Sequence, residues 1–437
     1  MSRNPDSLLV RELGVRQLAA NIFNYTVGSG IFALPAFAVL QLGAAAPLAY
    51  ITCAILIGLV VTCFAEAGSR VDSTGGPYAY VETALGPFVG FMAGCLVLST
   101  GTSAAAGIFS LLARSIVKLF PAAPAWTTPV VIVALVMVLV SVNVRGVKTG
   151  ARVVEAMTVI KLVPLIGFIV VGAFFLHPQN WVWSDVPSLT QVLSTSGIVL
   201  FAFSGIEGSL VPSGEVTNPS RSVPRAALFA LSAVTVLYLA VQFVALGAAG
   251  LALGNDRTTP LAAAAAQMVG PPGRTIMIVA AVISMTGYLS ANVLSEPRGV
   301  FAFSRDGFLP RFFSAVHPRF RTPHYAIYVY GAVVTAIALS GTFEQLATFS
   351  NLAALMLYFL VAISAWQLRR RNVRSDGEPF TPPGGATVNV AACIAVACVF
   401  YETVERTQFL WLMGVLVVIC LLYGLRSLRG GFSEKRG

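Results

Sequence analysis

Hydrophobic residues in this chain gather in long runs, and proline, glycine or charged residues bound each run. A helix needs about 20 mainly apolar residues to cross the hydrocarbon core of a bilayer, and these runs reach or approach that length. The pattern therefore predicts twelve membrane-spanning helices, at residues 17–40, 44–68, 87–117, 126–143, 153–176, 191–213, 226–250, 273–302, 325–341, 346–367, 386–403 and 408–426.

The composition agrees with a membrane protein. Of the 437 residues, 57% are hydrophobic and only 11% are charged, whereas a soluble domain carries about 25% charged residues. The mean hydropathy is +0.81. We therefore expect an all-α polytopic membrane protein whose surface is mostly covered by lipid, with no signal peptide and no separate soluble domain. The segment PLAAAAAQM, within residues 251–270, predicts one short helix outside the membrane.

The basic residues predict the orientation. Of the 28 lysines and arginines, 22 lie at the two ends of the chain or in the loops after spans 2, 4, 6, 8 and 10, and five lie in the opposite set of loops. Cytoplasmic loops carry the excess of positive charge. Both termini, residues 1–16 and 427–437, are therefore expected in the cytoplasm. The net charge of +10 is a topology signal, so we expect membrane lipid and not nucleic acid as the partner.

Glycines interrupt two of the spans at similar depth. Span 1 contains Gly28-Ser29-Gly30, and span 6 contains Gly205-Ile206-Glu207-Gly208. Backbone leaves the helix at membrane depth only where protein or a wet cavity satisfies its polar groups. A half-helix N-terminus then offers N–H groups to a carboxylate, and free carbonyls accept from an ammonium. An α-amino acid carries both groups. Ordinary packing of small residues is the alternative.

The spacing of the two interruptions suggests an internal repeat. Spans 1 and 6 lie five spans apart, and an odd offset inverts the orientation. We therefore expect one five-helix repeat at residues 17–176 and an inverted repeat at residues 191–367, with two extra helices at residues 386–426. Residues 28–33 also fit a dinucleotide-binding glycine pattern, but they follow no strand and lie inside an apolar span.

Four segments resemble the amino acid–polyamine–organocation (APC) transporter superfamily. They read GSGIF at 28–32, GGPYAYVETALG at 75–86, GEVTNPSRSVPRA at 214–226 and SRDGFLP at 304–310. The resemblance extends over nearly the whole chain. It implies the leucine-transporter-type fold of two inverted five-helix repeats plus two further helices.

The resemblance also implies a binding site at the two interruptions. The carboxylate of the solute would meet the backbone of Gly28, Ser29 and Gly30, and its amine would face carbonyls near Phe201, Ala202 and Ser204. Thr26, Gly205 and Asn292 complete the residues expected to bind the solute. At the position of Asn292, some exchangers of cationic substrates carry a tryptophan, so the resemblance does not imply their substrate.

Three further residues are candidates for gating or proton coupling. By resemblance, Glu207 matches a proton-sensitive gate, Tyr358 falls near a gating aromatic, and Lys161 takes the place of the sodium ion of sodium-coupled relatives. Each has a simpler alternative: Lys161 snorkels to the membrane surface, and Glu207 is a structural partner of backbone amides. We expect Glu66 to form a structural ion pair with Arg70, four residues later.

These observations predict a secondary active transporter of amino acids in the plasma (inner) membrane. We expect alternating access without sodium, driven by proton symport or by exchange, with a polyamine or cationic amine exchanger as the alternative. A major facilitator transporter, a channel and a membrane enzyme fit less well, because the sequence lacks a long central loop and convergent catalytic groups. We expect no cofactor and no metal; the pattern fits a monomer or a homodimer.

Overall fold

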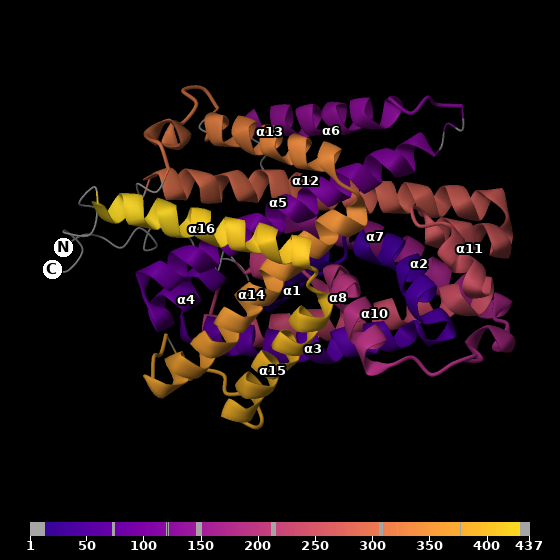
Figure 1. Ribbon diagram of the computed structural model, residues 1–437, viewed down its shortest axis with the longest axis horizontal. Coiled ribbons are helices and arrows are strands. Elements are labelled where there is room, and N and C mark those ends of the chain that lie inside the picture. Colours follow the sequence, from indigo (N-terminus) through magenta and orange to yellow (C-terminus); the bar gives the residue numbers. More distant parts are fainter. Residues whose placement is uncertain are drawn as a thin grey trace.

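The computed structural model describes residues 14–71, 75–118, 120, 122–145, 151–210, 216–305, 309–320, 322–375 and 377–428. For residues 151–157, 302, 305 and 425–428 it describes only the backbone. The described chain is almost entirely helical, and its long helices run roughly along one axis (Figure 1). Of the predicted termini, residues 1–16 and 427–437, the parts at 1–13 and 429–437 lie outside the described residues.

The α-helices are α1 (Val15–Thr26), α2 (Gly30–Leu42), α3 (Pro47–Arg70), α4 (Pro77–Leu85), α5 (Pro87–Val117), α6 (Thr127–Val144), α7 (Ala151–Gly172), α8 (Leu189–Phe203), α9 (Ile206–Ser209), α10 (Pro219–Ala249), α11 (Pro260–Val269), α12 (Pro271–Arg305), α13 (His324–Ser340), α14 (Phe343–Arg370), α15 (Ala386–Thr403) and α16 (Arg406–Leu428). The 3-10 turns are η2 (Gly43–Ala45), η3 (Ala173–Phe175), η4 (Pro178–Trp181), η6 (Gly250–Asn255) and η7 (Arg311–Ser314).

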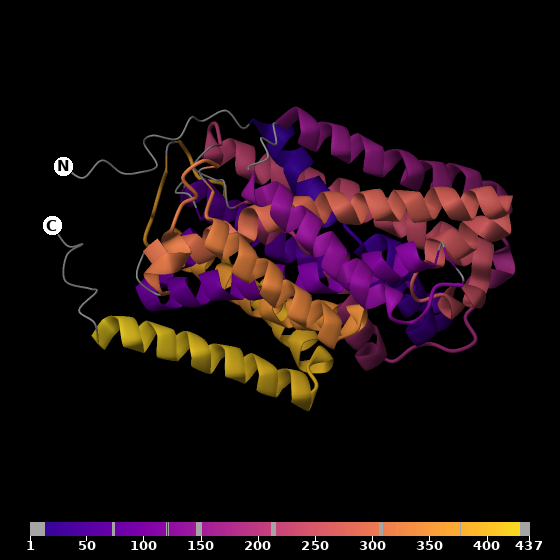
Figure 2. The same cartoon turned by 90° about the horizontal axis from the view of Figure 1, so that it is seen from above.

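Within the described residues, ten helices are long and apolar enough to cross a membrane, and the bent pair α1–α2 makes an eleventh candidate. The predicted span at 325–341 forms α13, an apolar helix of 17 residues. Every predicted span coincides with a helix or a broken helix, so the all-helical polytopic class is confirmed with ten or eleven candidate spans. α16 lies along the outside of the bundle (Figure 2).

Local sequence signals explain where many helices begin. Proline occupies the first turn of α3, α4, α5, α10 and α11, where its missing N–H leaves no hydrogen bond unmade. Capping boxes begin α8 and α14: Ser188 pairs with Gln191, and Thr342 pairs with Gln345. Each box satisfies two amides at a helix N-terminus.

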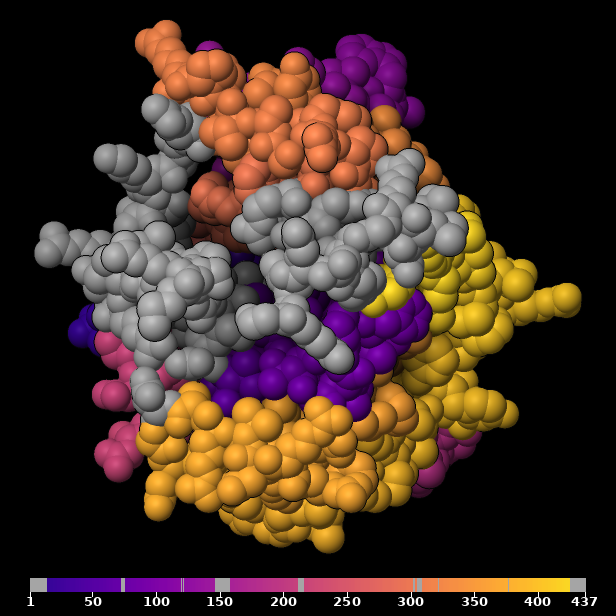
Figure 3. Space-filling view, turned by 90° about the vertical axis from the view of Figure 1, so that its left-hand side faces the viewer, coloured from indigo at the N-terminus to yellow at the C-terminus, as the bar shows by residue number. Residues whose placement is uncertain are grey.

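Two short helices lie outside the long spans. α11 confirms the short helix expected within residues 251–270. α4 was not predicted; Pro77 begins it and Gly86, with φ of +95°, ends it. Figure 3 looks onto the end of the molecule where α4 lies, and there the violet surface lies directly above the golden surface.

The two interruptions are present and pack against each other. α1 and α2 meet at a bend of 48°. A Cβ atom on Gly30 would lie 2.5 Å from the Cα of Ala202 in α8. Gly205 has φ of +128°, and a Cβ there would lie 2.9 Å from the carbonyl oxygen of Tyr25. Only glycine fits at these two positions. The backbone of Ala202 occupies the space that a side chain on Gly30 would need, and the backbone of Tyr25 does the same for Gly205.

A buried cluster of charges joins three helices. Glu66 of α3 is fully buried and pairs with Arg70 at 3.4 Å, as predicted. Arg369 of α14 completes a two-pronged pair with the same carboxylate; its Nε donates to Glu66 Oε1 at 2.5 Å. Arg369 also donates to the side chain of Asn389 in α15. One carboxylate therefore holds two guanidinium groups that would otherwise be buried without a counter-charge.

Near the opposite end of the bundle, Asp256 follows η6 and accepts from Lys118 at 2.5 Å and from the amides of Thr258 and Thr259. Burial opposes the charged form, but the bonds from Lys118 and Thr259 outweigh it and hold the pKa of Asp256 below its usual range. This pair ties the end of α5 to the segment that precedes α11.

The contact between Gly30 and Ala202 leads to a first prediction. Gly30→Ala should lower the free energy of unfolding by about 1–3 kcal/mol, the usual cost of overpacking a tight contact. Gly58→Ala is the control, because a Cβ at Gly58 in α3 meets nothing within 4 Å. Thermal unfolding of the purified variants in detergent measures both. Equal melting temperatures for the two variants would contradict the described contact.

The charge cluster leads to a second prediction. Glu66→Gln leaves Arg70 and Arg369 without a negative partner, so it should lower the free energy of unfolding by roughly 3 kcal/mol, the low end for a broken buried pair because Arg369 is 20% exposed. Glu405→Gln removes the same charge at an exposed position before α16 and should leave the melting temperature unchanged. A stable Glu66→Gln variant would show that the cluster is not held by charge.

Candidate functional site

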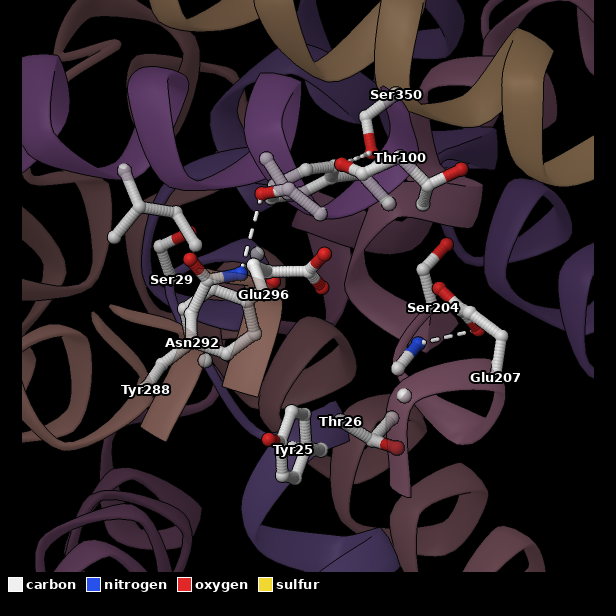
Figure 4. Close-up of a pocket in the computed structure, with 18 of the residues that line it drawn as sticks. Tyr25, Thr26, Ser29, Thr100, Ser204, Glu207, Tyr288, Asn292, Glu296 and Ser350 are labelled. Atoms are coloured by element: carbon white, nitrogen blue, oxygen red, sulfur yellow. Dashed lines mark hydrogen bonds between the residues drawn. The ribbon is translucent and has the colours of Figure 1, made fainter. Parts of the chain in front are cut away.

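A pocket lies where the two interrupted helices meet (Figure 4). Nine of the residues expected at the site line it: Thr26, Gly28, Ser29, Gly30, Phe201, Ser204, Gly205, Glu207 and Asn292. Side chains of α5, α12 and α14 close the rest of the wall: Val97, Thr100, Gly101, Ala104, Ile108, Tyr288, Glu296 and Ser350. Tyr25 and Gly208 complete the lining. Ala202, Lys161 and Tyr358 lie behind this wall.

The N-terminus of α2 points at the pocket. Ser29 and Gly30 form its first turn, and no described residue accepts a hydrogen bond from either backbone amide. The hydroxyl of Ser29 is buried and also lacks a partner among the described residues. Free amides at a helix N-terminus favour a negative group. This wall of the pocket can therefore accept an anionic group such as a carboxylate.

The C-terminus of α8 faces the same space. α8 ends at Phe203, so its last carbonyls have no amide one turn further along the helix. Phe201 and Ser204 line the pocket, whereas Ala202 packs behind it against Gly30. The pocket thus has free amides at one helix end and free carbonyls at another.

Glu207 lies in the first turn of the short helix α9 and is 5% exposed. Its Oε2 accepts from the amide of Gly205 at 3.0 Å and from the hydroxyl of Tyr358 at 3.0 Å. Tyr358 is fully buried in α14 and packs edge-on against Phe64. Tyr358 therefore reaches the site only through Glu207. The carboxylate closes the break in span 6 as a local backbone partner and also borders the pocket.

Lys161 of α7 is 1% exposed and points inward, so it does not snorkel to the membrane surface. Its ammonium donates to the carbonyls of Asn24 at 3.1 Å and Val27 at 3.2 Å. These carbonyls belong to the last turn of α1, the negative end of its dipole. No carboxylate lies within ion-pair distance among the described residues. The lysine thus braces the break in span 1 from the side away from the pocket.

Two hydroxyl groups that the sequence analysis missed share this task. Ser284 of α12 lies within hydrogen-bond distance of the carbonyls of Val27 and Gly28. Tyr238 of α10 donates to the carbonyl of Thr26 at 3.0 Å. Three helices, α7, α10 and α12, therefore supply donors to four of the carbonyls at the interruption. Neither residue carries a sequence signal, since single hydroxyl groups are common in membrane helices.

Asn292 borders the pocket, but its amide already has protein partners. Its Nδ2 donates to the carbonyl of Gly101 at 3.2 Å, and its Oδ1 accepts from Tyr330 at 2.6 Å. These bonds connect α12 to α5 and α13. Asn292 is therefore a packing residue at the wall of the pocket.

Glu296 is the pocket residue of greatest chemical consequence that the sequence analysis missed. It lies in α12, one turn beyond Asn292 and two beyond Tyr288, so the three side chains share one helix face. The signal was a carboxylate inside the apolar run 273–302, the same signal that drew attention to Glu207. Its neighbours Pro297 and Arg298 make that end of the run look like the start of a loop.

Comparison with known proteins places the chain in a family. The family model described as amino acid permease matches residues 13–423. A branched-chain amino acid permease of Bacillus subtilis is 26% identical, covering 86% of this chain and 85% of the relative. A methylthioribose transporter of the same organism is 28% identical over similar shares, 86% and 85%. A vacuolar cationic amino acid transporter of Arabidopsis thaliana is 27% identical, covering 85% of this chain and 65% of the relative.

These relatives are named for different solutes, but all are transporters and none is an enzyme. The matched region includes both interrupted helices and every residue of the pocket. The resemblance first seen in four short segments therefore extends over most of the sequence. The chain belongs to the amino acid permease family of the APC superfamily, whose members share the leucine-transporter-type fold.

Proposed function

We propose that this protein is a secondary active transporter that carries amino acids across the membrane by alternating access, without sodium. One observation supports this most directly: the free amides of Ser29 and Gly30 and the open end of α8 face a single pocket. The carboxylate of an amino acid binds at the first and its ammonium at the second. Either proton symport or exchange supplies the energy.

The bonds around Lys161 support the absence of a sodium requirement. Carbonyl oxygens at a half-helix C-terminus, with a nearby hydroxyl, form the kind of oxygen site that binds sodium in transporters of this fold. Here the ammonium of Lys161 donates to Asn24 and Val27, and Ser284 contacts Val27 and Gly28. A covalently attached cation does the electrostatic work at this break, so a bound ion is not needed.

We further propose the topology that the sequence predicts. Counting α13 gives twelve spans, with residues 17–176 and 191–367 as inverted repeats, residues 386–426 as two extra helices, and both termini in the cytoplasm beneath the plasma membrane. Three contacts support the repeats: α2 packs on α8, α3 on α10, and α5 on α12. In each pair, a span meets the span five places later, which is consistent with two inverted repeats that pack about a two-fold axis.

A polyamine or other cationic amine is the second candidate. Among the described residues, two carboxylates and no lysine, arginine or histidine line the pocket. Such a solute has no carboxylate and would leave the amides of Ser29 and Gly30 without a partner. An uptake panel on the purified protein in liposomes should include amino acids, putrescine and spermidine. Saturable uptake of polyamines alone would favour the second candidate over the first.

The sodium proposal makes a third prediction. Replacing sodium by choline on both sides of the liposome membrane should leave the initial rate of amino acid uptake unchanged, because Lys161 supplies the positive charge at the break. The same vesicles, run with and without a pH gradient and with and without internal amino acid, separate proton symport from exchange. A strict sodium requirement would refute the proposed role of Lys161.

The fourth prediction concerns the charge of Lys161. Lys161→Met keeps the bulk and removes the ammonium, so the carbonyls of Asn24 and Val27 lose their donor and transport should fall more than tenfold. Lys161→Arg keeps a charge that is never lost. If the charge only braces α1, the arginine variant retains partial transport. If Lys161 must release its proton in each cycle, the arginine variant binds solute but does not transport it.

Substrate binding must be measured beside transport for both variants, since a guanidinium that does not fit would abolish both together. Ser284→Ala offers a milder comparison, because it removes a neutral donor to the Val27 carbonyl, which Lys161 also contacts. Wild-type transport in Lys161→Met would show that the break in span 1 does not depend on the buried cation.

A further inference from the structure

The carboxyl group of Glu296 occupies a space made for it by another helix. A Cβ atom on Gly101 of α5 would collide with Glu296 Oε1. The Gly101 carbonyl is in turn fixed by Asn292, one turn before Glu296. Figure 4 shows Glu296 pointing into the pocket from α12, with Ser204 and Glu207 on another side. The position of the carboxylate is thus set by the packing of α5 on α12.

This carboxylate has no counter-charge among the described residues. No described residue forms a hydrogen bond or ion pair with it, whereas Glu207 accepts from Gly205 and Tyr358. The described part of the pocket lining includes no basic side chain. Glu296 is partly exposed to the pocket itself. Its charge is therefore directed at whatever fills the pocket, and a charged group at membrane depth requires a partner.

A zwitterionic amino acid does not supply that partner. Its carboxylate goes to the amides of Ser29 and Gly30, and its single ammonium goes to the carbonyls at the end of α8 with Glu207 beside them. Both of its charges are then used. With Glu296 ionised, a neutral amino acid leaves one carboxylate uncompensated in a water-poor pocket, and the occupied site is disfavoured.

We propose that Glu296 is a specificity-determining residue that receives a second cationic group, at the side-chain end of the transported amino acid. The solute class is then an amino acid with a basic side chain, an ammonium or a guanidinium. This rests on the proposed function and refines it. A charge-assisted bond to a carboxylate is stronger than a neutral one, so the basic group is favoured over an isosteric neutral group.

Two matched pairs of solutes test the proposal. Arginine and citrulline have nearly the same shape, and norleucine is lysine without its terminal ammonium group. Only the first of each pair carries a side-chain cation. Competition against a labelled substrate in liposomes gives apparent affinities for the wild type. We expect the cation to be preferred by at least tenfold in each pair. Glu296→Gln should reduce that preference to less than about threefold, mainly by weakening binding of the cation.

Controls separate this effect from misfolding and from a general loss of charge. Glu296→Gln removes an unpaired carboxylate, so its melting temperature should equal or exceed that of the wild type, unlike that of Glu66→Gln. Glu405→Gln should keep the full cation preference. Gly101→Ala keeps the charge but displaces the carboxylate, so it should also reduce the preference.

The outcomes are distinct. Equal or better binding of citrulline and norleucine by the wild type, or an unchanged preference in Glu296→Gln, overturns the role of Glu296 and leaves amino acid transport standing. A preference that persists while the pH dependence of transport changes assigns Glu296 to proton transfer instead, and also overturns the proposal. Failure of every amino acid to bind or to be carried overturns both the proposal and the proposed function.

Discussion

The close contact between two interrupted helices determines where everything else in the pocket lies. Gly30 meets Ala202, and Gly205 meets the backbone of Tyr25, so each break is the packing surface of the other. Backbone at these positions cannot form regular helical bonds, and the bilayer offers none. Polar groups from the surrounding helices must therefore converge on this one place. The pocket is a consequence of that requirement, because the same convergence brings α5, α12 and α14 around the breaks.

The hydrogen-bond acceptors and donors around the first break differ in whether the protein supplies their partners. The carbonyls of Asn24, Thr26, Val27 and Gly28 receive donors from Lys161, Tyr238 and Ser284, which lie on three different helices. The amides of Ser29 and Gly30 receive none from the described residues. The described helices thus supply donors to four carbonyls at this break and leave the two amides open toward the pocket. Such an arrangement is suited to a ligand with a negative group, and a ligand of that kind would complete the hydrogen bonding of the break.

Sequence periodicity predicted the helices well because lipid imposes one simple requirement, a long apolar run, and the runs end where proline, glycine or charge ends them. It could not separate spans from shorter apolar helices, as α13 shows with its 17 residues. It also missed α4, a helix of nine residues between two longer ones. Its start and stop signals, Pro77 and Gly86, are equally typical of a loop.

The site was predictable from the sequence where it contains residues that are rare in membrane helices. Glycines at membrane depth and a lone lysine or glutamate in an apolar run are costly, so Gly30, Gly205, Glu207 and Lys161 attracted attention. Ser284 and Tyr238 did not, because a single hydroxyl costs little in a membrane helix and becomes informative only when its partner is known. Tyr358 and Asn292 were expected through resemblance, and their contacts with Glu207 and Gly101 emerge only from the packing.

Glu207 and Glu296 differ in their surroundings although both are carboxylates at the same pocket. Glu207 sits within a turn whose own amide at Gly205 points at it, so its place is fixed by local backbone and by Tyr358. Glu296 sits inside a continuous helix, where every amide is already used, and only the side-chain space left by Gly101 admits it. A carboxylate bound by its own backbone can serve the integrity of the break. The described residues position the carboxylate of Glu296 but do not neutralise it, and it serves no evident packing purpose. Its partner is therefore expected among the contents of the pocket.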